Sequence, residues 1–204
     1  MPSTEEIKKQ NQKIIILLVM SFAIPIIAAY VVFFNMGEVT KTRNYGELIT
    51  PARPLETLNL QTLKGQDFGF EALKGKWHLV YIGKGQCNDI CQERLSTMHQ
   101  TRMGQGSAMS RVRLVYIALG GIDSAVANNL TKSYSRLSVL SAKGQDQNKT
   151  IKLFQSDANT MIRDDHLIFI IDPLGNLMMR YKKDVRLIGI IKDLEHLLKV
   201  SRIG

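Results

Sequence analysis

The segment WHLVYIGKGQCNDIC, residues 77–91, joins a short apolar run to two closely spaced cysteines. The apolar run, residues 77–82, ends at a glycine, and this pattern predicts a buried strand. A short loop follows, and residues 89–102 have the pattern of a helix. The segment therefore predicts a strand and then a helix, with Cys87 and Cys91 where the helix begins.

Strands and helices alternate over the rest of the domain. Apolar runs predict the strands, and amphipathic or capped segments predict the helices. In chain order we expect a strand at 112–117, a helix at 123–134, a strand at 137–140, a weak helix at 147–156, strands at 167–171 and 177–181 around a turn at 172–176, and a helix at 185–200. Alternating strands and helices form parallel crossovers, and the hairpin adds antiparallel strands. This order predicts an α/β fold, a thioredoxin-like sandwich of a mixed sheet with flanking helices.

An uncharged apolar segment, residues 14–34, lies ahead of this domain. It is long enough to cross a bilayer as a helix, and it exceeds the ~7–15 apolar residues of a signal peptide. We therefore expect an uncleaved transmembrane anchor in contact with the lipid bilayer. The chain then divides into a cytoplasmic tail, 1–13, the anchor, a linker, 35–54, and the thioredoxin-like domain, 55–204.

The charge of the chain bears on its partners and its orientation. The 204 residues carry 27 Lys and Arg against 18 Asp and Glu, a formal net charge of +9. These basic residues form no long run, so we exclude nucleic acid; a positive domain at a bilayer favours anionic headgroups or an acidic partner. Three lysines precede the anchor, and Lys41 and Arg43 follow it. This small excess predicts an N-terminus inside and a domain that faces the periplasm or an equivalent space.

Cys87 and Cys91 are the two cysteines of the chain. Side chains at positions i and i+4 of a helix lie on the same face, so the two sulfurs can converge. A helix N-terminus favours thiolates, which both disulfide exchange and soft-metal binding require. A structural disulfide is the plainer alternative, although so short a loop gives little stabilisation. We expect the sulfurs to be exposed on the loop, where metal ligands can exchange.

A third metal ligand would come from the histidines. Three of the four lie too far along the chain from the cysteines or inside an unrelated helix: His78, His99 and His196. His166 remains, in the loop that enters the strand at 167–171, and in a thioredoxin-like sheet this loop lies beside the end of the first core strand. Two thiolates and an imidazole suit Cu(I) or Cu(II), and less exclusively Zn²⁺. Asp164 or Asp165 would orient the imidazole.

These motifs resemble those of the Sco family of copper chaperones for cytochrome c oxidase assembly. The resemblance covers about residues 50–200 and the N-terminal anchor. The family has a C-x-x-x-C motif after the first core strand and a His before a strand that ends in D-P-x-G. The counterparts here are Cys87 to Cys91, and His166 followed by Asp172-Pro173-Leu174-Gly175.

The chain departs from the family pattern at two places. Asn88 and Gln92 replace the two prolines of the usual C-P-x-x-C-P motif. Residues 118–123, ALGGID, replace an acidic stretch that contains proline. The three ligand types are kept, so the resemblance is that of a divergent member.

The resemblance implies a metallochaperone rather than an enzyme. Cys87, Cys91 and His166 would bind copper, as Cu(I) or Cu(II). A single-pass protein of the inner (cytoplasmic) membrane would deliver this copper to the copper-bearing subunit of cytochrome c oxidase, or prepare that subunit's copper site. We keep two alternatives. One is a thiol–disulfide reductase in which Cys87 and Cys91 are catalytic toward a partner protein, and the other is a non-catalytic assembly scaffold with a vestigial site.

Overall fold

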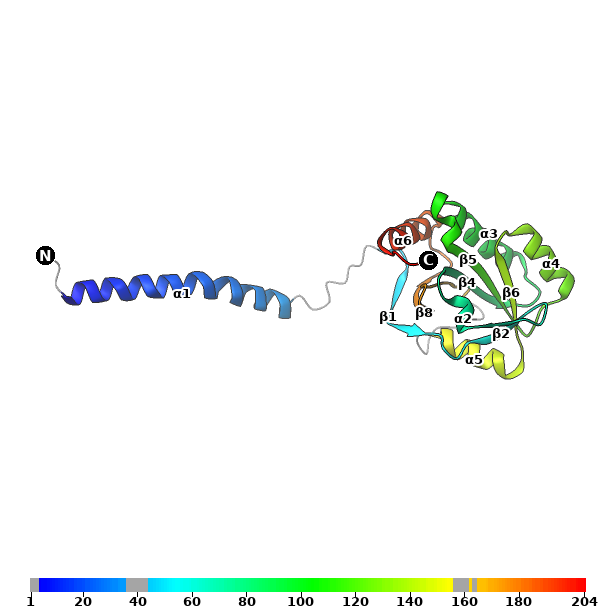
Figure 1. Cartoon of the computed structure of the whole chain (residues 1–204), viewed down its shortest axis with the longest axis horizontal. Coiled ribbons are helices and arrows are strands. Elements are labelled where there is room, and N and C mark those ends of the chain that lie inside the picture. The colour runs from blue at the N-terminus through cyan, green and yellow to red at the C-terminus, as the bar shows by residue number, and fades with distance from the viewer. Residues whose placement is uncertain (1–3, 36–43, 156–161, 163–164) are drawn as a thin grey trace. The chain divides into compact units, whose positions relative to one another are not determined.

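The structure is a computed structural model that describes residues 4–35, 44–155, 162 and 165–204. The chain divides into an N-terminal unit, which ends at Arg43, and a domain that begins at Asn44 (Figure 1). The elements, in chain order, are α1 (Thr4–Asn35), β1 (Glu47–Pro54), β2 (Asn59–Thr62), β3 (Asp67–Gly69), α2 (Phe70–Leu73), β4 (Trp77–Lys84), α3 (Asp89–Met103), the 3₁₀ helix η1 (Gly106–Arg111), β5 (Val112–Leu119), α4 (Ser124–Ser133), β6 (Leu137–Ala142), α5 (Gly144–Phe154), β7 (Ile168–Ile171), β8 (Asn176–Tyr181) and α6 (Leu187–Val200).

Helix α1 contains the predicted anchor. Its segment Lys8–Val32 is long and apolar enough to cross a membrane, with a mean hydropathy of 2.7. Large apolar side chains such as Leu17 and Phe22 are exposed along it, as expected of a helix whose surroundings are lipid. The helix begins at Thr4 and therefore includes most of the segment predicted as a polar tail.

One eight-stranded mixed sheet forms the centre of the domain, in the order β1-β8-β7-β4-β5-β6-β2-β3. Strands β4, β5 and β6 are parallel, and α3 and α4 lie between them in the chain. Strand β7 pairs antiparallel with β4, and β8 with β7. β4 and β5 are almost entirely buried, which explains why their sequences are continuous apolar runs rather than alternating ones. This is the predicted α/β sandwich.

Helices cover both faces of the sheet, with α3, α4 and α6 on one side and α5 on the other (Figure 1). On the first face, Leu95 of α3 and Leu194 of α6 join the core with side chains from the strands. On the second face, Phe154 of α5 and Leu73 of α2 belong to a separate core cluster. Each fully buried side chain of this size contributes about 1.5–3 kcal/mol relative to exposure, so the two clusters stabilise the packing of the helices against the sheet.

The predicted linker, 35–54, is too long. Residues 47–54 form β1, which pairs antiparallel with β8 at the edge of the sheet, and the domain begins at Asn44 rather than at residue 55. The sequence suggests a linker because Pro51 and Pro54 disfavour a strand. Both prolines are tolerated because an edge strand has one side without ladder hydrogen bonds.

Candidate metal centre

Cys87 and Cys91 lie where β4 leads into α3. Asn88 is the N-cap of α3, and its Oδ1 accepts a hydrogen bond of 3.2 Å from the Cys91 backbone N–H. Cys91 is therefore in the first turn of the helix, at the positive end of the helix dipole. Cys87 precedes the cap with a φ of 40°, in the left-handed region that non-glycine residues rarely adopt.

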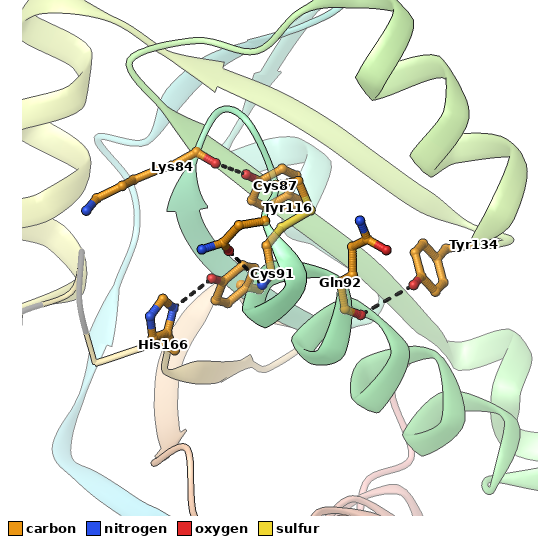
Figure 2. The surroundings of a disulfide bond; sticks show 9 residues. Lys84, Cys87, Cys91, Gln92, Tyr116, Tyr134 and His166 are labelled. Atoms are coloured by element: carbon orange, nitrogen blue, oxygen red, sulfur yellow. Dashed lines mark hydrogen bonds between the residues drawn. A yellow bond between two sulfur atoms is a disulfide. The ribbon is translucent and has the colours of Figure 1, made fainter.

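The two cysteines form a disulfide, with their Cα atoms 4.9 Å apart (Figure 2). Only 6% of the Cys87 surface and 2% of the Cys91 surface are exposed. The prediction of exposed sulfurs is therefore wrong. Both side chains belong to the apolar core on the α3 face of the sheet, so the loop and the helix cover them.

A groove of about 320 Å³ nevertheless reaches Cys87. It runs between the cysteine loop and α4, and most of its lining is polar. The lining residues are Gln86, Cys87, Gln92, Val126, Asn129, Leu130, Ser133 and Tyr134. A partner can therefore approach the disulfide from the α4 side, where amide and hydroxyl groups offer hydrogen bonds.

His166 lies two residues ahead of β7, and Ile168 of that strand is opposite Tyr81 of β4. Because the two strands are antiparallel, His166 lies at the end of β4 from which the cysteine loop leaves, as predicted (Figure 2). Its φ is 49°. Among the described residues, the non-glycine residues with a positive φ are Cys87, Arg136 and His166. Two of these three are candidate ligands, and backbone strain concentrates at functional sites.

Tyr81 holds the imidazole of His166. The Tyr81 hydroxyl lies 3.0 Å from Nδ1 of His166, and the two ring centroids are 6.4 Å apart. Tyr81 is 1% exposed, and burial raises its pKa to about 12, so the hydroxyl is protonated at neutral pH. Of the two carboxylates predicted for this role, Asp164 lies outside the described residues, and the role of Asp165, which is exposed, stays a prediction. The sequence signal that was missed is a tyrosine inside a buried strand, whose hydroxyl must find a partner.

A second tyrosine, Tyr116 of β5, supports the cysteine loop. Its ring is stacked on that of Tyr81 with the centroids 5.7 Å apart. Its hydroxyl donates a hydrogen bond of 2.5 Å to the backbone carbonyl of Lys84, which also accepts from the Cys87 backbone N–H at 3.3 Å. Burial raises the pKa of Tyr116 above its usual value. The stacked pair thus contacts both the start of the cysteine loop and His166.

Of the other histidines, two lie away from this site, and His99 contacts Tyr134, which lines the groove at Cys87. His78 is at the opposite end of β4, and burial lowers its pKa to about 4. His99 packs edge-on against Tyr134, with ring centroids 5.8 Å apart. His196 is exposed on α6. Choosing His166 from the sequence thus agrees with the arrangement of the strands.

The structure does not gather the predicted ligands into a metal site. In the part of the chain that it describes, no group of three or more His, Cys, Asp or Glu side chains is arranged to hold a metal ion. The disulfide joins Cys87 to Cys91, while His166 lies at the same end of the sheet and is bonded to Tyr81. A disulfide offers no thiolate, so reduction must come before binding. The reduced donor set, two thiolates and an imidazole, fits copper and other soft or borderline metals.

A family model described as "Transmembrane-like, thioredoxin-like, C-terminal domain" matches residues 77–201. The chain belongs to this family, and the predicted thioredoxin-like fold is confirmed. Because the apolar helix α1 precedes the matched domain, the chain has the organisation of a single-pass membrane-anchored protein.

Curated and solved relatives agree with this fold. The chain is 35% identical over 72 residues to a Stutzerimonas stutzeri protein named "Putative copper-binding protein", and the match covers 35% of each chain. The structure of Arabidopsis thaliana ScoI with copper bound has a TM-score of 0.60 and 16% identity, covering 75% of this chain and 99% of that one. BsSco, described as a member of the Sco family of cytochrome c oxidase assembly proteins, has a TM-score of 0.57 and 14% identity, covering 74% and 96%. The predicted resemblance to Sco proteins is thus confirmed at the level of the fold.

Proposed function

We propose that this protein is a membrane-anchored copper-binding factor for the assembly of cytochrome c oxidase. Cys87, Cys91 and His166 hold the copper ion, as Cu(I) or Cu(II), and the ion is cargo for the copper-bearing subunit of the oxidase. One arrangement carries the proposal. Two cysteines at a helix N-terminus and a histidine ahead of the adjacent strand β7 lie at the same end of the sheet.

The relatives support copper as the cargo and the oxidase as its destination. ScoI of Arabidopsis thaliana was solved with copper bound, and the Stutzerimonas stutzeri relative is named for copper binding. BsSco is described as an oxidase assembly protein with a disulfide switch. This chain offers thiolate and imidazole donors, which suit copper.

Loading begins with reduction of the disulfide. A partner dithiol supplies two electrons and two protons, the Cys87–Cys91 bond breaks, and the partner leaves as a disulfide. The N-terminus of α3 then favours loss of the thiol protons, because its backbone N–H groups and dipole stabilise thiolates. Binding a soft metal releases those protons. Exchange with a partner disulfide, which leaves as a dithiol, re-forms the Cys87–Cys91 bond and removes two ligands together.

The anchor places the site at a membrane surface. The lysines of the N-terminal segment outnumber the basic residues that directly follow the span, which favours a cytoplasmic N-terminus. The domain then faces the periplasm or an equivalent space, from the inner (cytoplasmic) membrane. This is also a compartment in which disulfides persist.

A thiol–disulfide reductase is the second candidate, and the disulfide itself favours it. Cys87 lines a polar groove, where a partner chain can bind and present its own disulfide for exchange. In this role Cys87 and Cys91 are catalytic, and His166 has no part in the electron transfer.

Complementation in cells tests the proposal and separates the candidates. Full-length variants are expressed in a strain that lacks the protein, and the copper content and activity of the oxidase are measured. We expect Cys87→Ser and His166→Ala each to abolish copper loading, while His196→Ala, at an exposed histidine on α6, has no effect. Loss with Cys87→Ser but not with His166→Ala favours the reductase. Normal oxidase assembly with Cys87, Cys91 and His166 all substituted favours a scaffold.

A further inference from the structure

Tyr81 is a buried polar group that the predicted ligand set does not use. Its ring lies in the apolar core on the α3 face of the sheet, with 1% of its surface exposed, yet its hydroxyl reaches the candidate site and lies 3.0 Å from His166 Nδ1. A buried hydroxyl needs a partner, and this one has the imidazole. The contact joins a rigid strand to a residue on a loop.

We infer that Tyr81 is a positioning residue that orients His166 and makes Nε2 the nitrogen that binds copper. This inference rests on the proposed function, in which His166 is a copper ligand. Histidine ligands of metal ions usually donate their other ring N–H to a fixed acceptor, which sets both the tautomer and the ring orientation. Tyr81 supplies such an acceptor from within the protein.

The hydrogen bond between the Tyr81 hydroxyl and His166 Nδ1 can form with either neutral tautomer of the imidazole. A neutral imidazole carries one N–H, and a tyrosine hydroxyl can either donate or accept. When the hydroxyl donates to Nδ1, the proton of the imidazole is on Nε2. Nε2 then has no free lone pair and cannot bind a metal ion. When Nδ1–H donates to the hydroxyl oxygen, Nε2 has its lone pair. Between these states one proton leaves Nε2 for solvent and one reaches Nδ1 from solvent, so the ring stays neutral and the hydroxyl only rotates.

The packing of Tyr81 makes it a fixed point for this contact. Its ring is nearly parallel to that of Tyr116, at an interplanar angle of 13°, and Tyr116 is itself fully buried. The Tyr116 hydroxyl holds the Lys84 carbonyl, at the start of the cysteine loop. The two neighbouring hydroxyls therefore bind different parts of the site. That of Tyr81 binds His166, and that of Tyr116 binds the start of the loop that carries Cys87.

Tyr81→Phe removes the hydroxyl and keeps the ring, so it tests the inference directly. The matched control is Tyr134→Phe, because the Tyr134 hydroxyl is also near the site but bonds to the Gln92 carbonyl at 3.3 Å. Full-length protein in detergent micelles, reduced and free of copper, is examined by ¹⁵N NMR of the imidazole nitrogens. We expect the His166 signals to move in Tyr81→Phe and to stay unchanged in Tyr134→Phe.

Copper binding provides the second measurement. We expect Tyr81→Phe to weaken Cu(II) binding by about 10–100-fold, the usual effect of losing a residue that orients a ligand. Cu(I) binding should weaken less, because soft thiolates dominate its affinity. The Cu(II) electron paramagnetic resonance spectrum should show altered coupling to the imidazole nitrogen.

The results separate this inference from the proposed function. If His166→Ala weakens copper binding while Tyr81→Phe matches the unsubstituted protein in both affinity and NMR signals, Tyr81 does not position the ligand. If His166→Ala binds copper as the unsubstituted protein does, the proposed ligand set fails. The NMR result on copper-free protein still decides whether Tyr81 sets the state of His166.

Discussion

A Cβ atom placed on Gly85 would lie 1.6 Å from the carbonyl oxygen of Gly121. The loop that carries Cys87 therefore touches the β5–α4 loop backbone against backbone, with no room for a side chain. Real Cβ atoms do not approach a carbonyl oxygen so closely, so any substitution at residue 85 must move one loop away from the other. The position of Cys87 depends on this contact.

Gly85→Ala is expected to displace the cysteine loop and to destabilise the domain by about 1–3 kcal/mol, the usual cost of forcing extra atoms into a packed site. Denaturant unfolding measures the stability, and the rate of disulfide reduction measures the exposure of the sulfurs, which should increase. The control is Gln86→Ala, at the exposed neighbouring residue. Equal stability and equal reduction rates for the two variants would show that the loop contact has no influence on the disulfide.

The carboxylate of Asp193 in α6 binds the backbone just ahead of β1, where the domain begins. Its side chain is 4% exposed, and its Oδ2 accepts hydrogen bonds of 2.9 Å from the backbone N–H groups of Tyr45 and Gly46 and one of 3.2 Å from the Tyr181 hydroxyl. Asp193→Ala leaves these donors without their partner.

We expect Asp193→Ala to lower the free energy of unfolding by about 3 kcal/mol or more, because hydrogen bonds to a charged group contribute about 1.5–3 kcal/mol each and buried donors are left unpaired. Thermal unfolding of the full chain in detergent measures the effect. Glu195→Ala removes an exposed carboxylate from the same helix and should cost little. If both variants lose the same stability, the contacts of Asp193 do not hold the first strand.

The buried His78 predicts a pH dependence of stability. Burial lowers its pKa from 6.5 to about 4 in the folded chain, whereas the unfolded chain takes up this proton near pH 6.5. Between these values the unfolded state binds more protons, so stability falls as the pH is lowered from about 6.5 to 4, by up to about 3 kcal/mol. Below pH 4 both states are protonated at this residue and its contribution no longer changes.

His78→Leu should reduce this pH dependence, because leucine fills the buried position without a titrating group. Unfolding free energies at pH 7 and pH 5 are compared for the unsubstituted chain, His78→Leu and the exposed control His196→Gln. The control should keep the full pH dependence. An unchanged slope in His78→Leu would mean that other groups account for the loss of stability at low pH.

The sequence predicts the centre of the fold better than its edges, for a physical reason. Strands β4 and β5 are buried on both faces, so their apolar runs are long and continuous, and helix α4, which follows β5, has a clear cap in Asp123. β1 has mostly exposed or half-buried residues and two prolines, so it carries no apolar signal. The short strands β2 and β3 and helix α2 were missed for the same reason, because few of their residues are buried.

For the candidate site too, the sequence predicts some features and not others. The positions of Cys87, Cys91 and His166 relative to the strands follow from residue type, spacing and strand order. The buried sulfurs and the Tyr81–His166 hydrogen bond do not follow, because they depend on how α3 and β7 pack against the sheet. A tyrosine in an apolar strand indicates burial, and only the three-dimensional arrangement gives its partner.

Copper stoichiometry decides whether Cys87, Cys91 and His166 form one copper site. The full chain in detergent is reduced and titrated with Cu(I) against a competing chelator, together with Cys91→Ser and His166→Ala. We expect one tightly bound equivalent, lost in Cys91→Ser and weakened in His166→Ala. Absence of tight copper, or tight copper that does not depend on His166, would contradict a site made of two cysteines and this histidine.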